Sequence, residues 1–265
     1  MAAQQRYTWV LNCIESREQE KDWNDDSIIS PDAARAAKTV KLPAAVDLRK
    51  NADWWTIGNQ KDTGSCVGWA TGDGVIRYQM VKAGMLTSDK MLSVRYLWMA
   101  AKETDEYLSR PTSFIESAGT FIKAACMIAQ KYGVIEDDVL QLFGGKLCHY
   151  EVGQLYAIAA RRRISSFVNL GVPGDKWKKW LAQDRPIATR LCCDDVWMSG
   201  GKKGRLETYD EASASEGHAV TVAGYDDYGW IIRNSWGKQW GDSGYAYASY
   251  DYAAKAFTES YGVVV

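Results

Sequence analysis

One cysteine of the sequence lies where a thiol gains acidity. Cys66 follows a turn-like stretch, residues 62–65, and opens a predicted helix over residues 66–83. The N-terminal end of a helix carries about half a positive charge, which stabilises an anion. A neighbouring imidazolium lowers the pKa of such a thiol further, so that the thiolate becomes the resting form. We therefore predict that Cys66 is a nucleophile.

Three other residues have the types and positions to assist that thiolate. His218 is predicted to start a strand, and Asn234 follows at the end of the next apolar run. Two neighbouring antiparallel strands would bring them together, and an asparagine oxygen would then accept an imidazole N–H and orient the ring. Gln60 precedes Cys66 by six residues. Its amide and the Cys66 backbone N–H are predicted to form an oxyanion hole.

Helical patterns fill the middle of the chain, and strand patterns fill its last third. Gly68, Gly72 and Gly74 interrupt the first helical pattern, and we expect them to let another backbone come close. The other predicted helices span residues 92–102, 119–132, 151–163 and 176–182, and the predicted strands span residues 186–192, 219–225, 229–233, 244–249 and 261–265. Residues 199–217 are predicted to be a long surface loop. Helices followed by strands indicate an α+β fold.

Composition and charge exclude several classes of function. Lys and Arg number 32 and Asp and Glu number 33, so the net charge of −1 favours neither nucleic acid nor an anionic membrane. No apolar run reaches the length of a membrane span. The chain has two histidines and six cysteines without a C-x-x-C pair, so we expect neither a metal nor a cofactor. The start of the sequence lacks the pattern of a signal peptide, from which we expect a cytoplasmic protein with reduced thiols.

Three strings of the sequence together resemble the papain-like cysteine protease family. They are the glutamine and Gly-Ser-Cys turn ending at Cys66, the stretch 217–225 that begins Gly-His-Ala-Val, and the Asn-Ser-Trp-Gly string that begins at Asn234 and continues to Trp-Gly and Gly-Tyr. The stretch 42–50 is similar to the start of the family's mature chain. The resemblance covers residues 42–265.

The resemblance implies a fold and a division of the chain. Residues 41–265 would form the catalytic domain, after an N-terminal extension or short propeptide-like arm over residues 1–40. A helical lobe would span about residues 55–150 and a β-rich, barrel-like lobe about residues 151–265. The active-site cleft would lie between the two lobes.

The resemblance also implies a reaction and further site residues. Cys66, His218 and Asn234 would hydrolyse peptide bonds of peptide or protein substrates through a thioester, with Gln60 and Cys66 binding the oxyanion. Among the tryptophans, Trp236 would shield the triad and Trp240 would line the primed side of the cleft. Gly119 would contact the backbone of an extended substrate.

The sequence departs from the family pattern at several places. Val67 replaces the tryptophan that usually follows the nucleophile, and Thr63 replaces a framework cysteine. The substrate-binding Gly-Gly pair is reduced to Ala118-Gly119, and Thr120 stands where a pocket aromatic is usual. We therefore expect an intracellular or bacterial-type member without the framework disulfides, and the departures leave its subsite specificity open.

Two other functions and one regulatory question stay open on the sequence. A non-catalytic peptide-binding module, or a Cys-dependent acyltransferase or amidase, would use the same scaffold. Residues 1–40 precede the point where the family's mature chain begins. They either restrain activity by lying across the cleft or form a permanent structural arm.

Overall fold

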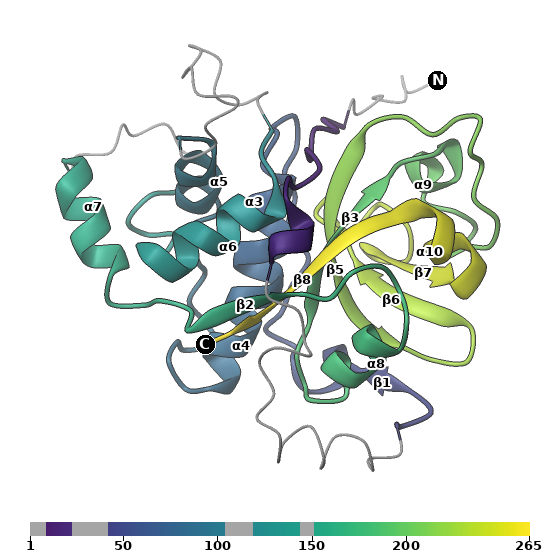
Figure 1. Ribbon diagram of the computed structural model, residues 1–265, viewed down its shortest axis with the longest axis horizontal. Coiled ribbons are helices and arrows are strands. Elements are labelled where there is room, and N and C mark those ends of the chain that lie inside the picture. The colour runs from purple at the N-terminus through teal and green to yellow at the C-terminus, as the bar shows by residue number, and fades with distance from the viewer. Residues whose placement is uncertain (1–8, 23–41, 104–118, 144–150) are drawn as a thin grey trace.

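The α-helices before residue 160 gather on one side of the molecule, and most strands lie on the other, in the computed structural model (Figure 1). The structure describes residues 9–22, 42–103, 119–143 and 151–265. Only part of the N-terminal extension, residues 9–22, is therefore described. The architecture is α+β, as the order of helical and strand patterns predicts.

The helical side is built around one continuous rod that begins at Cys66. It consists of α3 (Cys66–Gly68), the π-helical stretch η3 (Trp69–Ile76) and α4 (Arg77–Lys82). The glycines of this rod permit the expected close approach of another backbone, because a Cβ on Gly68 would lie 2.7 Å from the Val94 carbonyl oxygen. A Cβ on Gly74 would collide with the Thr221 hydroxyl of the sheet. The rod is followed by α5 (Val94–Glu103), α6 (Ile122–Lys131) and α7 (Val152–Ala159).

Helix α7 confirms the helix predicted over residues 151–163, but it belongs to the helical side and not to the β-rich lobe that the resemblance implied from about residue 151. The Tyr156 ring lies 4.8 Å from the Tyr132 ring and 6.1 Å from the Tyr96 ring, measured between centroids. Ala159 is buried in the same core cluster as α5 and α6. The chain therefore passes to the sheet after α7.

The strands form one sheet in the order β2-β8-β3-β5-β6-β7-β4, and β1 pairs with β5. The pairs are antiparallel except β4 with β7. The strands are β1 (Val46–Asp47), β2 (Ser166–Asn169), β3 (Ile187–Cys192), β4 (Arg205–Leu206), β5 (Gly217–Tyr225), β6 (Gly229–Arg233), β7 (Tyr245–Ser249) and β8 (Phe257–Val264). The resemblance implies a barrel-like lobe, and this expectation is wrong. The sheet is open, because its outermost strands β2 and β4 do not pair with each other.

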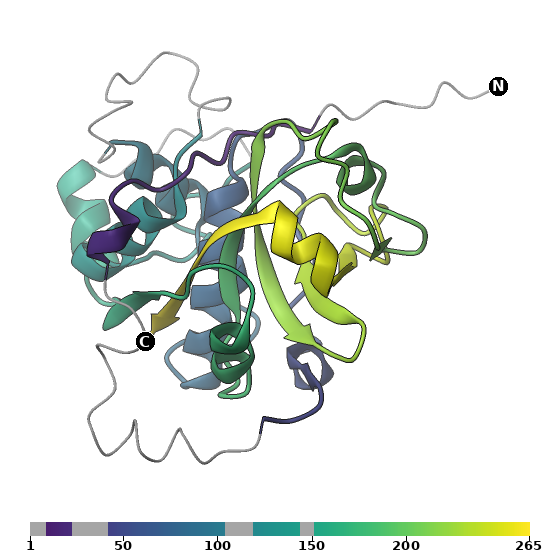
Figure 2. The ribbon, with the colours of Figure 1, turned by 45° about the vertical axis from the view of Figure 1, so that its right-hand side comes forward.

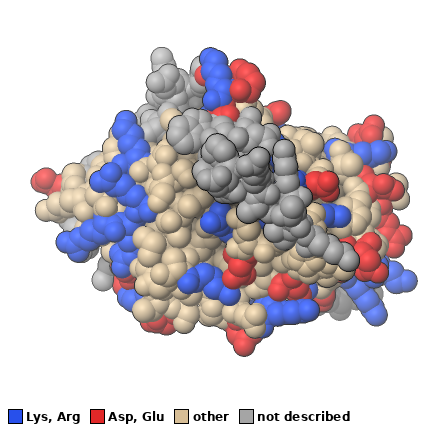
Figure 3. All heavy atoms as spheres, turned by 60° about the horizontal axis from the view of Figure 1, so that its bottom comes forward, with Lys and Arg blue, Asp and Glu red and all other residues tan. Residues whose placement is uncertain are grey.

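Short helical elements complete the structure around the sheet. They are η1 (Gln19–Lys21), η2 (Leu48–Asn51), α8 (Asp175–Leu181), α9 (Asp195–Ser199) and α10 (Tyr250–Ala256). The predicted loop over residues 199–217 contains β4 and otherwise joins α9 to β5. Basic and acidic side chains both occur across the face that Figure 3 shows.

A buried ionic cluster joins the helical side to the sheet beside Asn234. Asp73 of η3 accepts from Arg77 Nη1 at 3.0 Å and from Arg233 Nη2 of β6 at 2.5 Å. All three side chains are at most 3% exposed. Such a cluster holds its elements firmly, because separating a buried charge from its partner is costly.

Candidate active site

Cys66 lies at the first residue of the α3–η3–α4 rod and is fully buried. The pKa of its thiol is held well below the usual value, first by a hydrogen bond from the Cys13 thiol and then by His218. Burial opposes both effects. The thiol at this position therefore has thiolate character, which is the property that a nucleophile needs.

His218 and Asn234 are brought together by adjacent antiparallel strands, as the sequence predicts. His218 is the second residue of β5, and Asn234 follows the last residue of β6. His218 Nε2 lies 2.8 Å from Asn234 Oδ1. Nδ1 is buried and makes no hydrogen bond of good geometry to any described residue. The ring is thus oriented at one nitrogen, and the imidazole interacts with the Cys66 thiol.

Gln60 is fully buried beside the start of the rod. Its amide oxygen accepts from the Ser235 hydroxyl at 2.8 Å, and its amide nitrogen donates to the Thr63 carbonyl at 3.0 Å. The same nitrogen donates to the Val10 carbonyl at 3.2 Å. The glutamine is therefore held with one N–H directed at a peptide carbonyl, the arrangement that an oxyanion hole requires.

Tryptophan rings enclose the histidine. The Trp236 ring lies 4.6 Å from His218 and is 1% exposed. Trp240 packs edge-on behind Trp236 at 5.6 Å, and its Nε1 donates to the Trp197 carbonyl at 3.2 Å. This geometry places Trp236 over the histidine and Trp240 in a second layer, where it is 5% exposed. Direct contact of Trp240 with a substrate stays a prediction.

The N-terminal segment (residues 9–22) runs along the boundary between the helices and the sheet (Figures 1 and 2). The Trp9 ring stacks on Trp236 at 4.9 Å with parallel planes. Cys13 N donates to the Gly217 carbonyl at 2.8 Å, and the Cys13 thiol contacts the Cys66 thiol. The segment therefore covers Cys66, Gln60 and Trp236 together.

The segment is also held beyond the nucleophile. Ile14 N donates to the Thr120 carbonyl at 3.1 Å, and a Cβ on Gly119 would collide with the Asn12 carbonyl oxygen. Gly119 therefore lies against an extended backbone, which is the kind of contact that the sequence assigns to it.

Two buried groups hold the far part of the segment. The Ser16 backbone N–H and hydroxyl donate to the Glu259 carboxylate at 2.9 and 3.1 Å. Burial raises the pKa of Glu259 to about 7, against the effect of these two donors. Asp22 accepts from Tyr261 at 2.7 Å and forms an ion pair with Lys123.

Cys13 and Glu259 are functional candidates that sequence reasoning missed. Cys13 lies in a short run of mostly apolar residues, 9–14, and Glu259 is a single acidic residue between two hydroxyl-bearing residues. Neither position carries a local pattern. Glu259 lies two residues before the strand predicted over residues 261–265, so no expected strand contained it.

Comparison with known proteins decides the family. The family model for "Papain family cysteine protease" matches residues 42–263. The chain belongs to this family. Mouse cathepsin K is 25% identical to this papain-family chain over 236 residues, which cover 85% of the chain and 64% of cathepsin K. The chain spans a similar 64% of the length of human cathepsin L2.

Solved structures show that the fold is papain-like. Xylellain, a cysteine protease from Xylella fastidiosa, superposes with a TM-score of 0.79 at 18% identity, covering 100% of this chain and 99% of xylellain. Procathepsin B S9 from Trypanosoma congolense superposes with a TM-score of 0.70 at 15% identity, covering 96% and 86% of the two chains. At these identities the likeness establishes the fold.

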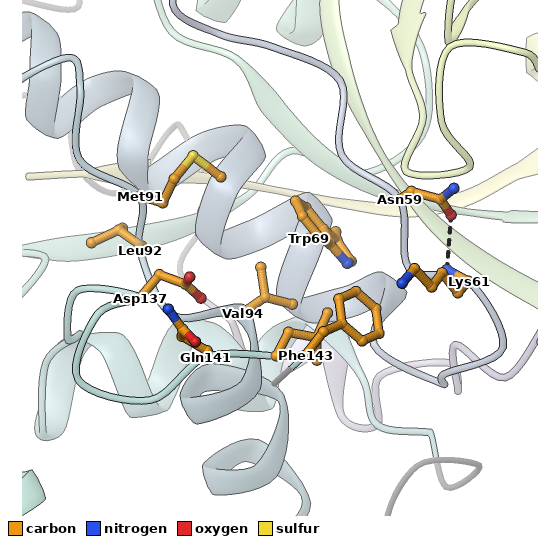
Figure 4. A pocket seen from close by; sticks show the side chains of 10 residues that line it. Asn59, Lys61, Trp69, Met91, Leu92, Val94, Asp137, Gln141 and Phe143 are labelled. Carbon is orange, nitrogen blue, oxygen red and sulfur yellow. Dashed lines mark hydrogen bonds between the residues drawn. The ribbon is translucent and has the colours of Figure 1, made fainter. Parts of the chain in front are cut away.

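This papain-family chain also has a pocket away from the triad (Figure 4). Its volume is about 390 Å³, and Asn59 and Lys61 line it on either side of Gln60 in the sequence. The Lys61 ammonium lies 4.2 Å from the centre of the Phe143 ring, and burial raises the pKa of Asp137. The described residues lining the pocket include none of the predicted catalytic residues.

The described part of the chain contains no group of three or more His, Cys, Asp or Glu side chains placed to hold a metal ion. None of its helices combines the length and the apolarity that crossing a membrane requires.

Proposed function

We propose that this papain-family chain is a cysteine peptidase whose nucleophile is Cys66. The observation that carries the proposal is the 2.8 Å contact between His218 Nε2 and Asn234 Oδ1. The contact supports a ring oriented beside the Cys66 thiol, whose pKa is lowered at the start of a helix. A nucleophile, a base and an orienting group in this order are the elements of nucleophilic acyl transfer.

The proposed reaction proceeds in two steps. The Cys66 sulfur forms a bond to the peptide carbonyl carbon, and the oxygen accepts hydrogen bonds from Gln60 Nε2 and the Cys66 backbone N–H. His218 then protonates the leaving amine, and the C–N bond breaks to give a thioester. Water attacks the thioester while His218 removes its proton, which releases the acid and the thiol. Trp236 keeps other water from the histidine during both steps.

The N-terminal segment is proposed to hold the enzyme inactive, in the manner of a zymogen. Its Val10 carbonyl accepts a hydrogen bond from Gln60 Nε2 at 3.2 Å, and its Trp9 ring stacks on Trp236. Its Cys13 thiol contacts the nucleophile. A peptide substrate needs the same donor and the same thiol, so the segment and a substrate exclude each other. Gly119 would then contact the substrate backbone once the segment has left.

The test compares four purified proteins on casein and on a mixed peptide library, with products identified by mass spectrometry. They are the full chain, a chain beginning at Lys41, and that shorter chain with Cys66→Ser or Cys126→Ser. We expect hydrolysis by the shorter chain at a higher rate than by the full chain. Cys66→Ser should abolish it, and Cys126→Ser, a substitution of a buried thiol in α6, should retain it.

Other outcomes would overturn the proposal in distinguishable ways. Hydrolysis that survives Cys66→Ser would exclude the proposed mechanism. A folded shorter chain that binds peptides without cutting them would instead be a peptide-binding module. Products joined to an added amine, in place of free acids, would indicate an acyltransferase. Equal rates for the full and shorter chains would exclude restraint by the segment and leave the mechanism intact.

A further inference from the structure

Two thiols distant in the sequence meet at the centre of the site. Cys13 and Cys66 are 2% and 0% exposed and lie in one buried cluster, in which the two thiols contact each other. Both are free thiols in this structure. The proposed peptidase reaction uses one of them and gives the other no role.

The backbone on each side holds the pair in place. Cys13 N donates to the Gly217 carbonyl at 2.8 Å, and the Cys13 carbonyl accepts from Arg190 Nε at 2.9 Å. Gly217 is adjacent to His218, and Cys66 begins the buried helical rod. The Cys13 backbone is therefore held at both its N–H and its carbonyl, and Cys66 is held by its helix, so the two sulfurs do not meet by chance contact of flexible side chains.

The two thiols also differ chemically in a complementary way. Contact with Cys13 and His218 lowers the pKa of Cys66, whereas burial first, and then contact with Cys66, raises the pKa of Cys13. Peroxides oxidise the thiolate of such a pair, and a neighbouring thiol then resolves the product. Cys66 is thus suited to react with a peroxide, and Cys13 is suited to form a disulfide with the oxidised Cys66.

We propose that Cys13 and Cys66 form a reversible disulfide that tethers the N-terminal segment over the nucleophile. The inference of a disulfide rests on the contact between the two thiols. The further statement that this disulfide would switch peptidase activity rests on the proposed function. While the bond exists the segment cannot leave, and Cys66 is protected from irreversible oxidation.

The proposed oxidant is a hydroperoxide, and the step balances. When the segment opens, the Cys66 thiolate attacks the terminal peroxide oxygen, the O–O bond breaks, and the alkoxide or hydroxide takes a proton. This gives a sulfenic acid on Cys66 and one alcohol or water. When the segment returns, the Cys13 sulfur attacks the sulfenic sulfur, and water leaves with the Cys13 proton. Two thiols lose two electrons to one peroxide, and an added dithiol reverses the bond by exchange.

Cys193 is the described thiol that competes most directly for Cys66. It is fully buried, and the charge of Cys66 contributes to raising its pKa. No hydrogen bond between Cys193 and Cys66 is present among the described residues, whereas Cys13 makes one. We therefore expect the bond to form with Cys13.

The experiment treats the full chain with increasing hydrogen peroxide, blocks remaining thiols with N-ethylmaleimide, and maps all six cysteines by mass spectrometry without reduction. The variants are Cys13→Ser, Cys193→Ser and, as the matched buried control, Cys126→Ser. We expect the wild type, Cys193→Ser and Cys126→Ser to give a peptide cross-link between Cys13 and Cys66 that dithiothreitol removes. Cys13→Ser should lack it and accumulate sulfinic or sulfonic acid at Cys66. Circular dichroism of each variant verifies folding before oxidation.

Several results would overturn the inference. They are a cross-link from Cys66 to Cys193, sulfinic acid at Cys66 in the wild type without any cross-link, or equal overoxidation of the wild type and Cys13→Ser. The mapping requires no peptide hydrolysis, so its outcome is independent of the proposed peptidase activity. A chain that forms the cross-link but hydrolyses no peptide would support the disulfide and refute the proposed function.

Discussion

Replacing Trp9 should release the proposed inhibition in a measurable amount. Its ring stacks on Trp236 with parallel planes and a 4.9 Å centroid separation, and the side chain is half-buried. Trp9 belongs to the segment and not to the proposed catalytic groups. Trp9→Ala therefore weakens the closed state and leaves the reacting residues unchanged.

The magnitude follows from the two contributions that the ring makes. Aromatic pairing stabilises by about 0.5–1.5 kcal/mol, and half-burial of a large apolar side chain adds about 1 kcal/mol. Losing about 2 kcal/mol raises the open fraction about 30-fold while the closed form predominates. The segment competes with substrate, so the apparent KM should fall by that factor, and kcat/KM should rise by it, at constant kcat.

The assay measures initial rates of the full chain on a quenched fluorescent peptide at concentrations below KM. The chain beginning at Lys41 sets the upper limit, and Trp9→Phe should lie between wild type and Trp9→Ala. Glu20→Ala, an exposed position of the same segment, serves as the control and should match wild type. An unchanged kcat/KM for Trp9→Ala, with a faster chain from Lys41, would refute the reasoning about the stacked ring.

Three further substitutions test other parts of the structure. Asp73→Ala leaves the Arg77 and Arg233 charges buried without their carboxylate, so it should lower the free energy of unfolding by about 3–5 kcal/mol and Tm by about 10 °C, measured by calorimetry. Burial raises the pKa of Glu259 from 4.5 to about 7. Its protonated form is favoured in the folded chain, so its contribution to stability is full below about pH 4.5 and falls by about 3 kcal/mol as pH rises to about 7. Glu259→Gln should remove that pH dependence in denaturation measured across the range, and unchanged profiles would contradict the burial argument. Asn234→Ala in the chain from Lys41 should lower kcat about 10²-fold at unchanged KM, because His218 loses its orienting acceptor; an unchanged kcat would exclude that role.

The sequence was sufficient to place the predicted catalytic residues because their positions depend on short connections. The strand predicted over residues 229–233 matches β6, and a tight connection from β5 sets the register that pairs Thr221 with Arg233. That register brings His218 and Asn234 together. The predicted helix over residues 66–83 agrees with the rod that begins at Cys66.

Other features depend on partners that no local pattern specifies. The four residues of β2 and the five residues of α9 are too short to show a period, and they form because β8 and the Asp194 side chain lie beside them. Closure of the sheet into a barrel depends on contacts between its outermost strands, which local sequence does not encode. The sequence did not predict the path of residues 9–22 for the same reason. Main-chain hydrogen bonds and single side-chain contacts determine that path, and neither leaves a pattern in the local sequence.

The N-terminal segment binds with groups that the proposed reaction also needs, and this limits how its affinity can be adjusted. The Gln60 amide serves the Val10 carbonyl in the closed state and would serve an oxyanion in the open state. A change at Gln60 would therefore alter both states together. Contacts such as Ser16 with Glu259 lie outside the proposed acyl-transfer groups. It follows that substitutions at this distant contact can change how often the site opens without changing the chemistry at Cys66.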